Sequence, residues 1–130
     1  MILLDTHIWV FWMTGAQGLS AGQQAALDAA GPGEIGVSPI SCWEIGQLVS
    51  RGRLTLSTGV ADWVDAALTH PNVRVVSLTP PIEVASTTLP DLEHKDPADR
   101  FLIATARALG CPLLTNDRVI LDYPHVATVD

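Results

Sequence analysis

The stretch Asp96–Gly110, DPADRFLIATARALG, carries a complete set of helix boundary signals. Asp96 is a good N-cap residue, and Pro97 suits the first helical position, where a missing N–H costs nothing. Gly110 is a natural residue for the C-terminal stop. Inside the stretch, three-and-four spacing predicts a buried face made of Phe101, Leu102, Thr105, Ala108 and Leu109. We therefore expect a helix that packs closely against a sheet or another helix.

Asp99 lies in the first turn of this expected helix. The free N–H groups and the helix dipole favour an anion at that position. Asp99 and Asp96 could therefore do no more than cap the helix. The same position also suits a carboxylate that stays ionised and binds a metal ion. The choice between capping and metal binding therefore depends on where the other acids of the chain lie.

The composition is typical of one compact domain. The chain has 130 residues, of which 48% are hydrophobic and 16% are charged, so it can form a core and disorder is not expected. No apolar run reaches the roughly 20 residues of a membrane span, and the first residues lack the basic region of a signal peptide. We expect a single cytoplasmic domain over residues 1–130, with Cys42 and Cys111 as reduced, packed thiols.

The chain is acidic, with a net charge of −7 from fourteen acidic residues and seven lysines and arginines. This balance argues against broad, non-specific nucleic-acid binding through a basic surface. It is compatible with a nuclease whose acidic pocket binds divalent cations. Ordinary solubility charge is the alternative explanation.

Short apolar or β-rich runs alternate with helical segments along the chain. The expected strands are residues 1–4, 35–37, 73–78, 112–115 and 125–129. The expected helices are residues 6–13, 20–30, 38–50, 60–69, 80–88, 97–109 and 119–121. This alternation predicts an α/β fold with a parallel sheet, in which ligands bind beyond the carboxyl ends of the strands.

Glu44 lies inside the helix expected over residues 38–50. Apolar residues four positions before and after it share its face, and a lone carboxylate on an apolar stripe needs a cation or a hydrogen-bond partner. A capping box that begins at Ser41 would explain Glu44 more simply. Ser38 followed by Pro39 is a better helix start, however, and places Glu44 well inside the helix.

Four acids are placed to meet at one edge of the expected sheet. Asp5 and Asp117 follow strands, while Glu44 and Asp99 come from helices that can reach the same edge. Carboxylates crowded in this way repel one another unless cations are present. Oxygen ligands suit Mg²⁺ or Mn²⁺, and such sites support phosphoryl chemistry. No zinc spacing competes, and the histidines are expected to be surface or capping residues: His7, His70, His94 and His125.

These acids lie in four sequence blocks that together resemble one family. The blocks are LDTH at 4–7, ISCWEI at 40–45 with RGRL at 51–54, HKDPADR at 94–100 before ATA at 104–106, and LTND at 114–117. In this order and spacing, over nearly the whole chain, they resemble a PIN-domain protein. More specifically, the chain is similar to the VapC-type toxins of type II toxin–antitoxin pairs.

The resemblance implies a single PIN domain with a central parallel sheet of about four or five short strands flanked by helices. It also implies a Mg²⁺- or Mn²⁺-dependent endoribonuclease that forms a homodimer and is inhibited by a cognate VapB-like antitoxin. The four acids Asp5, Glu44, Asp99 and Asp117 match the family's acidic quartet, with Asp5 and Asp99 as the central metal ligands.

Further residues are expected to support this site. Thr115 matches the family's hydroxyl position before the last acid, and Thr6 is a second candidate for a supporting role. Arg100 or Lys95 is expected to contact an RNA phosphate. Asp96 falls just outside the acidic quartet and is assigned to capping.

Two other functions are compatible with parts of the sequence. A receiver-like phospho-signalling domain also gathers acids at strand ends, but it requires adjacent acids after the first strand and a late lysine. Here Thr6 follows Asp5, and residues 115–116 offer no lysine. A non-catalytic module that docks an antitoxin or RNA would use the acids for electrostatics. The aromatic helix with Trp9 and Trp12, which either packs in the core or meets a partner, is compatible with such docking.

Overall fold

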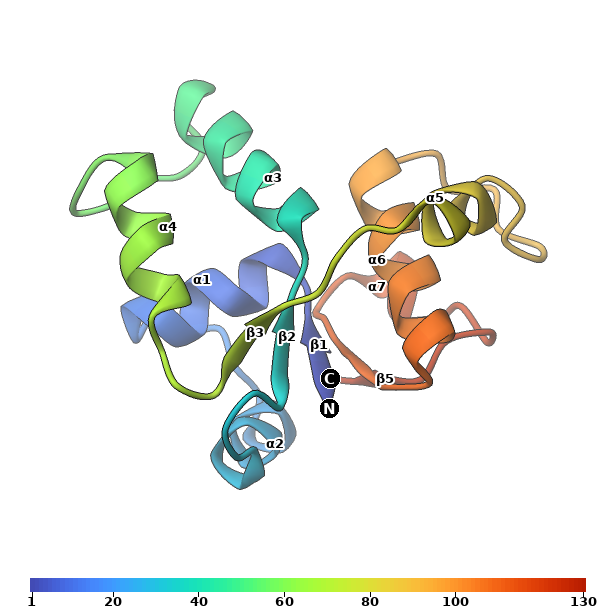
Figure 1. Ribbon diagram of the computed structural model, residues 1–130, viewed down its shortest axis with the longest axis horizontal. Coiled ribbons are helices and arrows are strands. Elements are labelled where there is room, and N and C mark those ends of the chain that lie inside the picture. Colours follow the sequence, from blue (N-terminus) through green and yellow to red (C-terminus); the bar gives the residue numbers. More distant parts are fainter.

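Five short parallel strands form the sheet at the centre of the computed structural model, which describes all 130 residues (Figure 1). The strands are β1 (Ile2–Leu4), β2 (Ile35–Val37), β3 (Val73–Val75), β4 (Leu113–Leu114) and β5 (Thr128–Val129). Their order across the sheet is β3-β2-β1-β4-β5, and every neighbouring pair is parallel. The expected α/β class and parallel sheet are confirmed.

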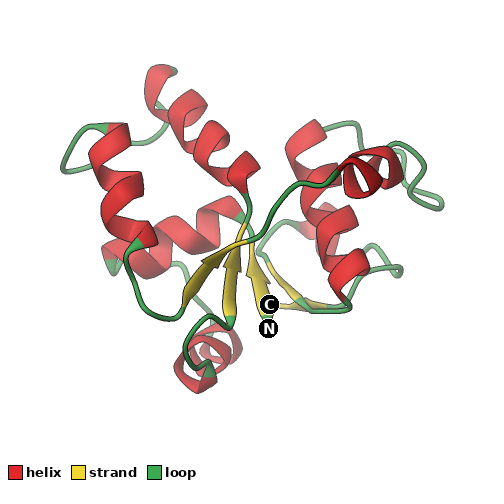
Figure 2. Ribbon diagram, in the orientation of Figure 1, coloured by secondary structure: helices red, strands yellow, loops and turns green.

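Seven helices connect and cover the strands. They are α1 (Thr6–Thr14), α2 (Ala21–Ala29), α3 (Pro39–Ser50), α4 (Val60–Leu68), α5 (Pro80–Ser86), α6 (Pro97–Leu109) and α7 (Arg118–Leu121). Figures 1 and 2 show α1 to α4 gathered on one side of the sheet and α5 to α7 on the other. None of these helices is both long enough and apolar enough to span a lipid bilayer.

The sheet is buried on both faces, which explains the continuous apolar run of β1. Leu3 and Leu4 are fully buried and point to opposite faces, because side chains alternate along a strand. Leu3 belongs to the core cluster that contains Leu102 of α6. Leu4 belongs to the other cluster, with Trp9 of α1 and Ile45 of α3.

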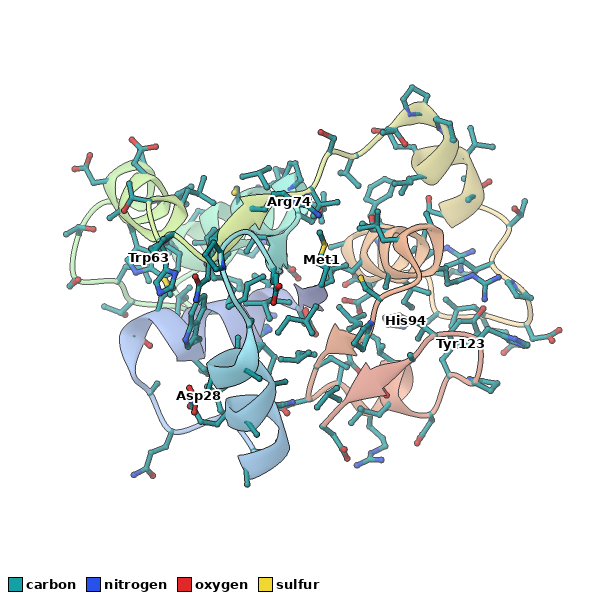
Figure 3. All side chains as sticks on the ribbon, turned by 60° about the horizontal axis from the view of Figure 1, so that its bottom comes forward. Met1, Asp28, Trp63, Arg74, His94 and Tyr123 are labelled. Carbon is teal, nitrogen blue, oxygen red and sulfur yellow. The ribbon has the colours of Figure 1, made fainter.

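The aromatic helix α1 contributes mainly to the core. Trp9 is fully buried and meets Trp63 of α4 edge to face, with the ring centroids 5.3 Å apart. Figure 3 shows the labelled Trp63 between α4 and α1. Trp12, one turn further on, is only half-buried and lies against His70, at 4.8 Å between ring centroids. The core interpretation therefore holds for Trp9, while Trp12 keeps part of its surface exposed.

Helix α6 has the boundaries that its sequence predicts, but its buried face differs from the expected one. Asp96 caps the helix by accepting a hydrogen bond from the N–H of Asp99, and Gly110 ends it in a left-handed conformation with φ of 62°. Ala98 and Asp99 are buried in the first turn and Leu102 to Ala106 in the middle of the helix, whereas Leu109 is 44% exposed. The expectation that Ala108 and Leu109 are buried is wrong, because the last turn extends beyond the covered part of the helix.

Four strands are shorter than the runs that predicted them, and the two edge strands lose the most residues. β3 ends at Val75 instead of residue 78, and β5 is limited to Thr128–Val129. Both are edge strands, so each has one neighbour only. Their lengths are limited by β2 and β4, which offer them three and two paired residues.

The corrected face of α6 gives a direct test by mutation. Leu102→Ala removes a fully buried side chain, and we expect it to lower the free energy of unfolding by about 2–5 kcal/mol. Leu109→Ala, on the same helix, is the matched control and should cost less than about 1 kcal/mol, because Leu109 is already half in water. Urea denaturation measures both. Equal reductions would show that the last turn of α6 is packed after all.

Candidate active site

A cavity of about 450 Å³ lies at the carboxyl ends of β1 and β4. This is the point where the strand order reverses, the usual ligand position in open parallel sheets. Five carboxylates line the cavity: Asp5, Glu44, Asp96, Asp99 and Asp117. The structure thus brings together all four acids selected from the sequence, and adds Asp96.

Asp5 is buried and held by hydrogen bonds at both of its carboxylate oxygens. Its Oδ1 accepts from the backbone N–H of Thr6 at 2.7 Å, and its Oδ2 accepts from the hydroxyl of Thr115 at 2.6 Å. The Thr115 hydroxyl oxygen in turn accepts from the N–H of Asp117 at 3.0 Å. Thr115 therefore links the end of β4 to the acid that follows β1, in keeping with its expected supporting role.

Glu44 is anchored through Thr6. The Thr6 hydroxyl donates to Glu44 Oε1 at 2.5 Å, and its oxygen lies 2.9 Å from the Ser41 hydroxyl oxygen. Ser38 caps α3, so Glu44 lies in the second turn and the alternative capping box from Ser41 is wrong. Thr6 donates its backbone N–H to Asp5 and its hydroxyl to Glu44, and it therefore orients two of the four acids.

His94 belongs to the site, although the sequence suggested only a surface or capping role. Its Nε2 lies 2.7 Å from Asp99 Oδ2. One ligand atom each from His94, Asp99 and Asp117 lie within 4.8 Å of one another, close enough to bind one metal ion. No firm sequence signal marks His94, because it lies in an irregular connection at no zinc-motif spacing. The hints were its place five residues before Asp99 and its position at the start of the HKDPADR block.

Burial makes this cavity electrostatically unfavourable for its own acids. It is the largest cause of the raised pKa of Asp5, of Glu44 and of Asp99. The pKa of Asp99 reaches about 7, because neighbouring carboxylates add to the effect of burial and outweigh the opposing hydrogen bond from His94. The cavity therefore disfavours the ionised form of these three acids.

The donor set fits a hard divalent cation. It offers several carboxylate oxygens and one imidazole, with no thiolate, which suits Mg²⁺ or Mn²⁺ better than zinc. A cation there would offset the repulsion between the acids and favour the ionised form of Asp99. His94, Asp99 and Asp117 can supply ligand atoms, and Asp5 lines the same cavity.

Arg100 makes three hydrogen bonds within the fold. Its guanidinium donates hydrogen bonds to the carbonyl oxygens of Ser86 at 2.8 Å, Leu92 at 3.2 Å and His94 at 2.9 Å. These bonds hold Nε and Nη1 of Arg100 on the α5–α6 connection, where they help to position His94, and the phosphate contact of Arg100 stays a prediction. Lys95 is exposed and without a hydrogen-bond partner, and its phosphate contact stays a prediction.

Gln23 of α2 is a supporting residue that the sequence reasoning missed. It is fully buried, and its Nε2 lies within hydrogen-bond distance of Thr115 O, Asn116 Oδ1 and Val129 O. These contacts fix the segment after β4 that carries Asp117. Gln23 also completes a capping box with Ser20, and that motif was its only sequence signal.

Comparison with known proteins points to one family. The family model described as "PIN domain" matches residues 2–126. Ribonuclease VapC22 of Mycobacterium tuberculosis is 34% identical over 124 residues, which cover 95% of this chain and 92% of that protein. A toxin–antitoxin complex from Klebsiella pneumoniae contains a chain with a TM-score of 0.68 and 18% identity, covering 100% of this chain and 97% of that chain. VapBC2 from Rickettsia felis, bound to a DNA fragment from their promoter, gives a TM-score of 0.71 and 18% identity, covering 99% and 98%.

The raised pKa of Asp99 predicts how stability depends on pH in the metal-free protein. The pKa rises from 3.8 to about 7 on folding, so the contribution to stability is complete below about pH 4 and is lost as the pH rises through about 7. We expect Tm in EDTA to fall between about pH 5 and pH 8, and to fall less in Asp99→Asn, which carries no titrating group there.

Asp122→Asn is the matched control, because Asp122 is an exposed acid paired with Arg118 at the surface. This variant should keep the pH dependence of the wild type. If the Tm of Asp99→Asn falls as much as that of the wild type over this range, the proposed electrostatics of the cavity are wrong.

Proposed function

The chain belongs to the PIN-domain family, and from that premise we propose that it is a Mg²⁺- or Mn²⁺-dependent endoribonuclease, the toxin of a type II toxin–antitoxin pair. The observation that carries the proposal is the meeting of Asp5, Glu44, Asp99 and Asp117 in one cavity. The ribonuclease relative supports RNA as the substrate.

The receiver-like alternative does not agree with the fold. The strand order β3-β2-β1-β4-β5 differs from the 2-1-3-4-5 order of flavodoxin-like sheets. No lysine lines the cavity. A phospho-signalling role is therefore dropped, and the non-catalytic docking module is the remaining alternative.

The residues around the cavity act by holding the carboxylates in a fixed arrangement. Asp5, Glu44, Asp99 and Asp117 would hold a divalent cation, which would supply Lewis-acid activation of water and offset the negative charge that develops on the phosphodiester. Asp5 keeps its orientation through two hydrogen bonds, and His94 orients Asp99. Glu44 is held by Thr6. Groups fixed in this way need little rearrangement during the reaction.

The proposal includes partners. A VapB-like antitoxin binds and inhibits the enzyme, and two copies of the chain form a homodimer. A structural relative was solved as a toxin–antitoxin complex, which supports the proposal of an antitoxin partner. The enzyme acts in the cytoplasm, where RNA is present and where the free thiols of Cys42 and Cys111 stay reduced.

The nuclease proposal is tested with purified protein and labelled RNA in the presence of Mg²⁺ or Mn²⁺. We expect cleavage by the wild type, and a fall in kcat/KM of roughly 100-fold or more in Asp5→Asn and in Asp99→Asn, because each removes a charge that holds the cation. Asp122→Asn, a change at an exposed acid, should retain full activity.

Equal cleavage by wild type and Asp99→Asn would point to a contaminating nuclease. If the protein binds RNA or an antitoxin without cleaving, and calorimetry detects no binding of Mn²⁺, the docking module is the better description.

The role of Thr115 can be tested separately from activity. Thr115→Val keeps the side-chain shape but removes the hydroxyl that donates to Asp5, and we expect Mn²⁺ affinity measured by calorimetry to fall about 10-fold. Thr105→Val is the matched control, because Thr105 is equally buried and donates only to the Phe101 carbonyl of its own helix. Unchanged Mn²⁺ affinity in Thr115→Val would exclude Thr115 as a positioning residue.

A further inference from the structure

A second cavity, of about 300 Å³, adjoins the acidic one. It lies between α3 and the N-terminal turn of α6, whose positions Figure 1 shows, and it shares Glu44 and Asp96 with the acidic cavity. Trp43, Arg51 and Arg53 line the part that is not shared. A ligand bound at the acidic site can therefore continue into a space with an aromatic ring and two cations.

Trp43 is the most exposed tryptophan of the chain. Its exposed fraction is 57%, whereas Trp9 is fully buried and Trp63 is 9% exposed. Trp12 is half-buried against a histidine ring. An exposed indole next to a cavity offers a flat surface on which a nucleobase can stack, and such stacking accepts any base.

The two arginines are the second unusual feature, because this chain has a net charge of −7. Arg51 and Arg53 are exposed, and their guanidinium groups make no hydrogen bond or ion pair in the structure. The other four arginines all have a contact within the fold: Arg74, Arg100, Arg107 and Arg118. The uncommitted guanidinium groups thus lie together beside the second cavity.

The spacing along α3 indicates which part of a substrate these arginines can reach. Arg51 lies seven positions after Glu44, which corresponds to a rise of roughly 10 Å along the helix. A phosphate at Arg51 and Arg53 is therefore a neighbour of the phosphate at the acidic site. Guanidinium groups bind phosphate oxygens strongly and in defined geometry.

We propose that the second cavity binds a nucleotide that flanks the cleaved bond of single-stranded RNA. Its base stacks on Trp43, and its phosphate pairs with Arg51 and Arg53. The base must be unpaired, because a base inside a duplex is already stacked on both faces. This inference rests on the proposed ribonuclease function and deepens it by naming a substrate subsite. The continuity with the acidic cavity favours RNA over a protein segment as the occupant.

The test measures RNA affinity in the Asp99→Asn background, so that binding is separated from cleavage. The probe is a fluorescein-labelled single-stranded RNA of mixed sequence, followed by polarisation over a range of salt concentrations. Trp43→Ala should weaken binding roughly 5- to 100-fold, and Trp43→Phe should restore most of the affinity, because it keeps an aromatic face. Arg51→Gln with Arg53→Gln should weaken binding and reduce the salt slope by about 0.7 for each RNA phosphate that is no longer paired with an arginine.

Arg74→Gln is the matched control, an exposed arginine on β3 outside both cavities, and it should bind RNA like the wild type. A duplex of the same sequence should bind equally well to Trp43→Ala and to its Asp99→Asn parent. In the active protein, the Trp43 and arginine changes should raise KM, with little effect on kcat or on Mn²⁺ affinity. An unchanged Tm shows that each variant is folded.

The outcomes separate this inference from the proposed function. If the active protein cleaves RNA but the variants keep KM and RNA affinity, the subsite is wrong and the nuclease stands. If the protein never cleaves but binds RNA through Trp43, the nuclease falls, and what remains of the inference is an RNA-binding cavity with no cleaved bond beside it. Weaker duplex binding in Trp43→Ala overturns the stacking. If the variants only fail to retain a co-purifying protein partner, the cavity serves that partner and the inference is overturned.

Discussion

Repulsion among carboxylates at the carboxyl end of the sheet is the constraint on which the site depends. Five acids line one cavity, and burial raises the pKa of three of them. Ionised acids in such a place need donors that hold them and a cation that offsets their charge. The hydroxyls of Thr6 and Thr115 are among these donors, and they tie the acids to α1 and β4.

The backbone supplies further compensation at the same place. Three acids that line the cavity are also N-caps: Asp5 of α1, Asp96 of α6 and Asp117 of α7. Each accepts a hydrogen bond from a backbone N–H of its own helix, and helix N-termini favour negative charge. Capping and metal binding are therefore compatible roles for an acid in this fold, and Asp5 and Asp117 are placed to perform both.

The distribution of positive charge follows from the same constraint. Arg100 is committed to backbone carbonyls and stabilises the connection that carries His94, so it contributes to the site through geometry. Positive charge available to an anionic substrate lies beside the cavity, at Arg51 and Arg53. An acidic protein can in this way combine a cation-binding centre with a small basic rim, and needs no broad basic surface.

Local sequence signals determined the helices, the strand alternation and the acids at strand ends, because capping, periodicity and β-propensity act over a few neighbouring residues. They were sufficient to predict that Asp5 and Asp117 share one edge of a parallel sheet. They could not determine which turn of α6 is buried or that Arg100 donates hydrogen bonds to backbone carbonyls. They also could not determine that His94 contacts Asp99 or that Gln23 holds the segment after β4. The contact of Gln23 with Val129 joins residues far apart in the chain, while the contacts of His94 and Arg100 form within an irregular connection that has no periodic pattern, so only the folded structure decides them.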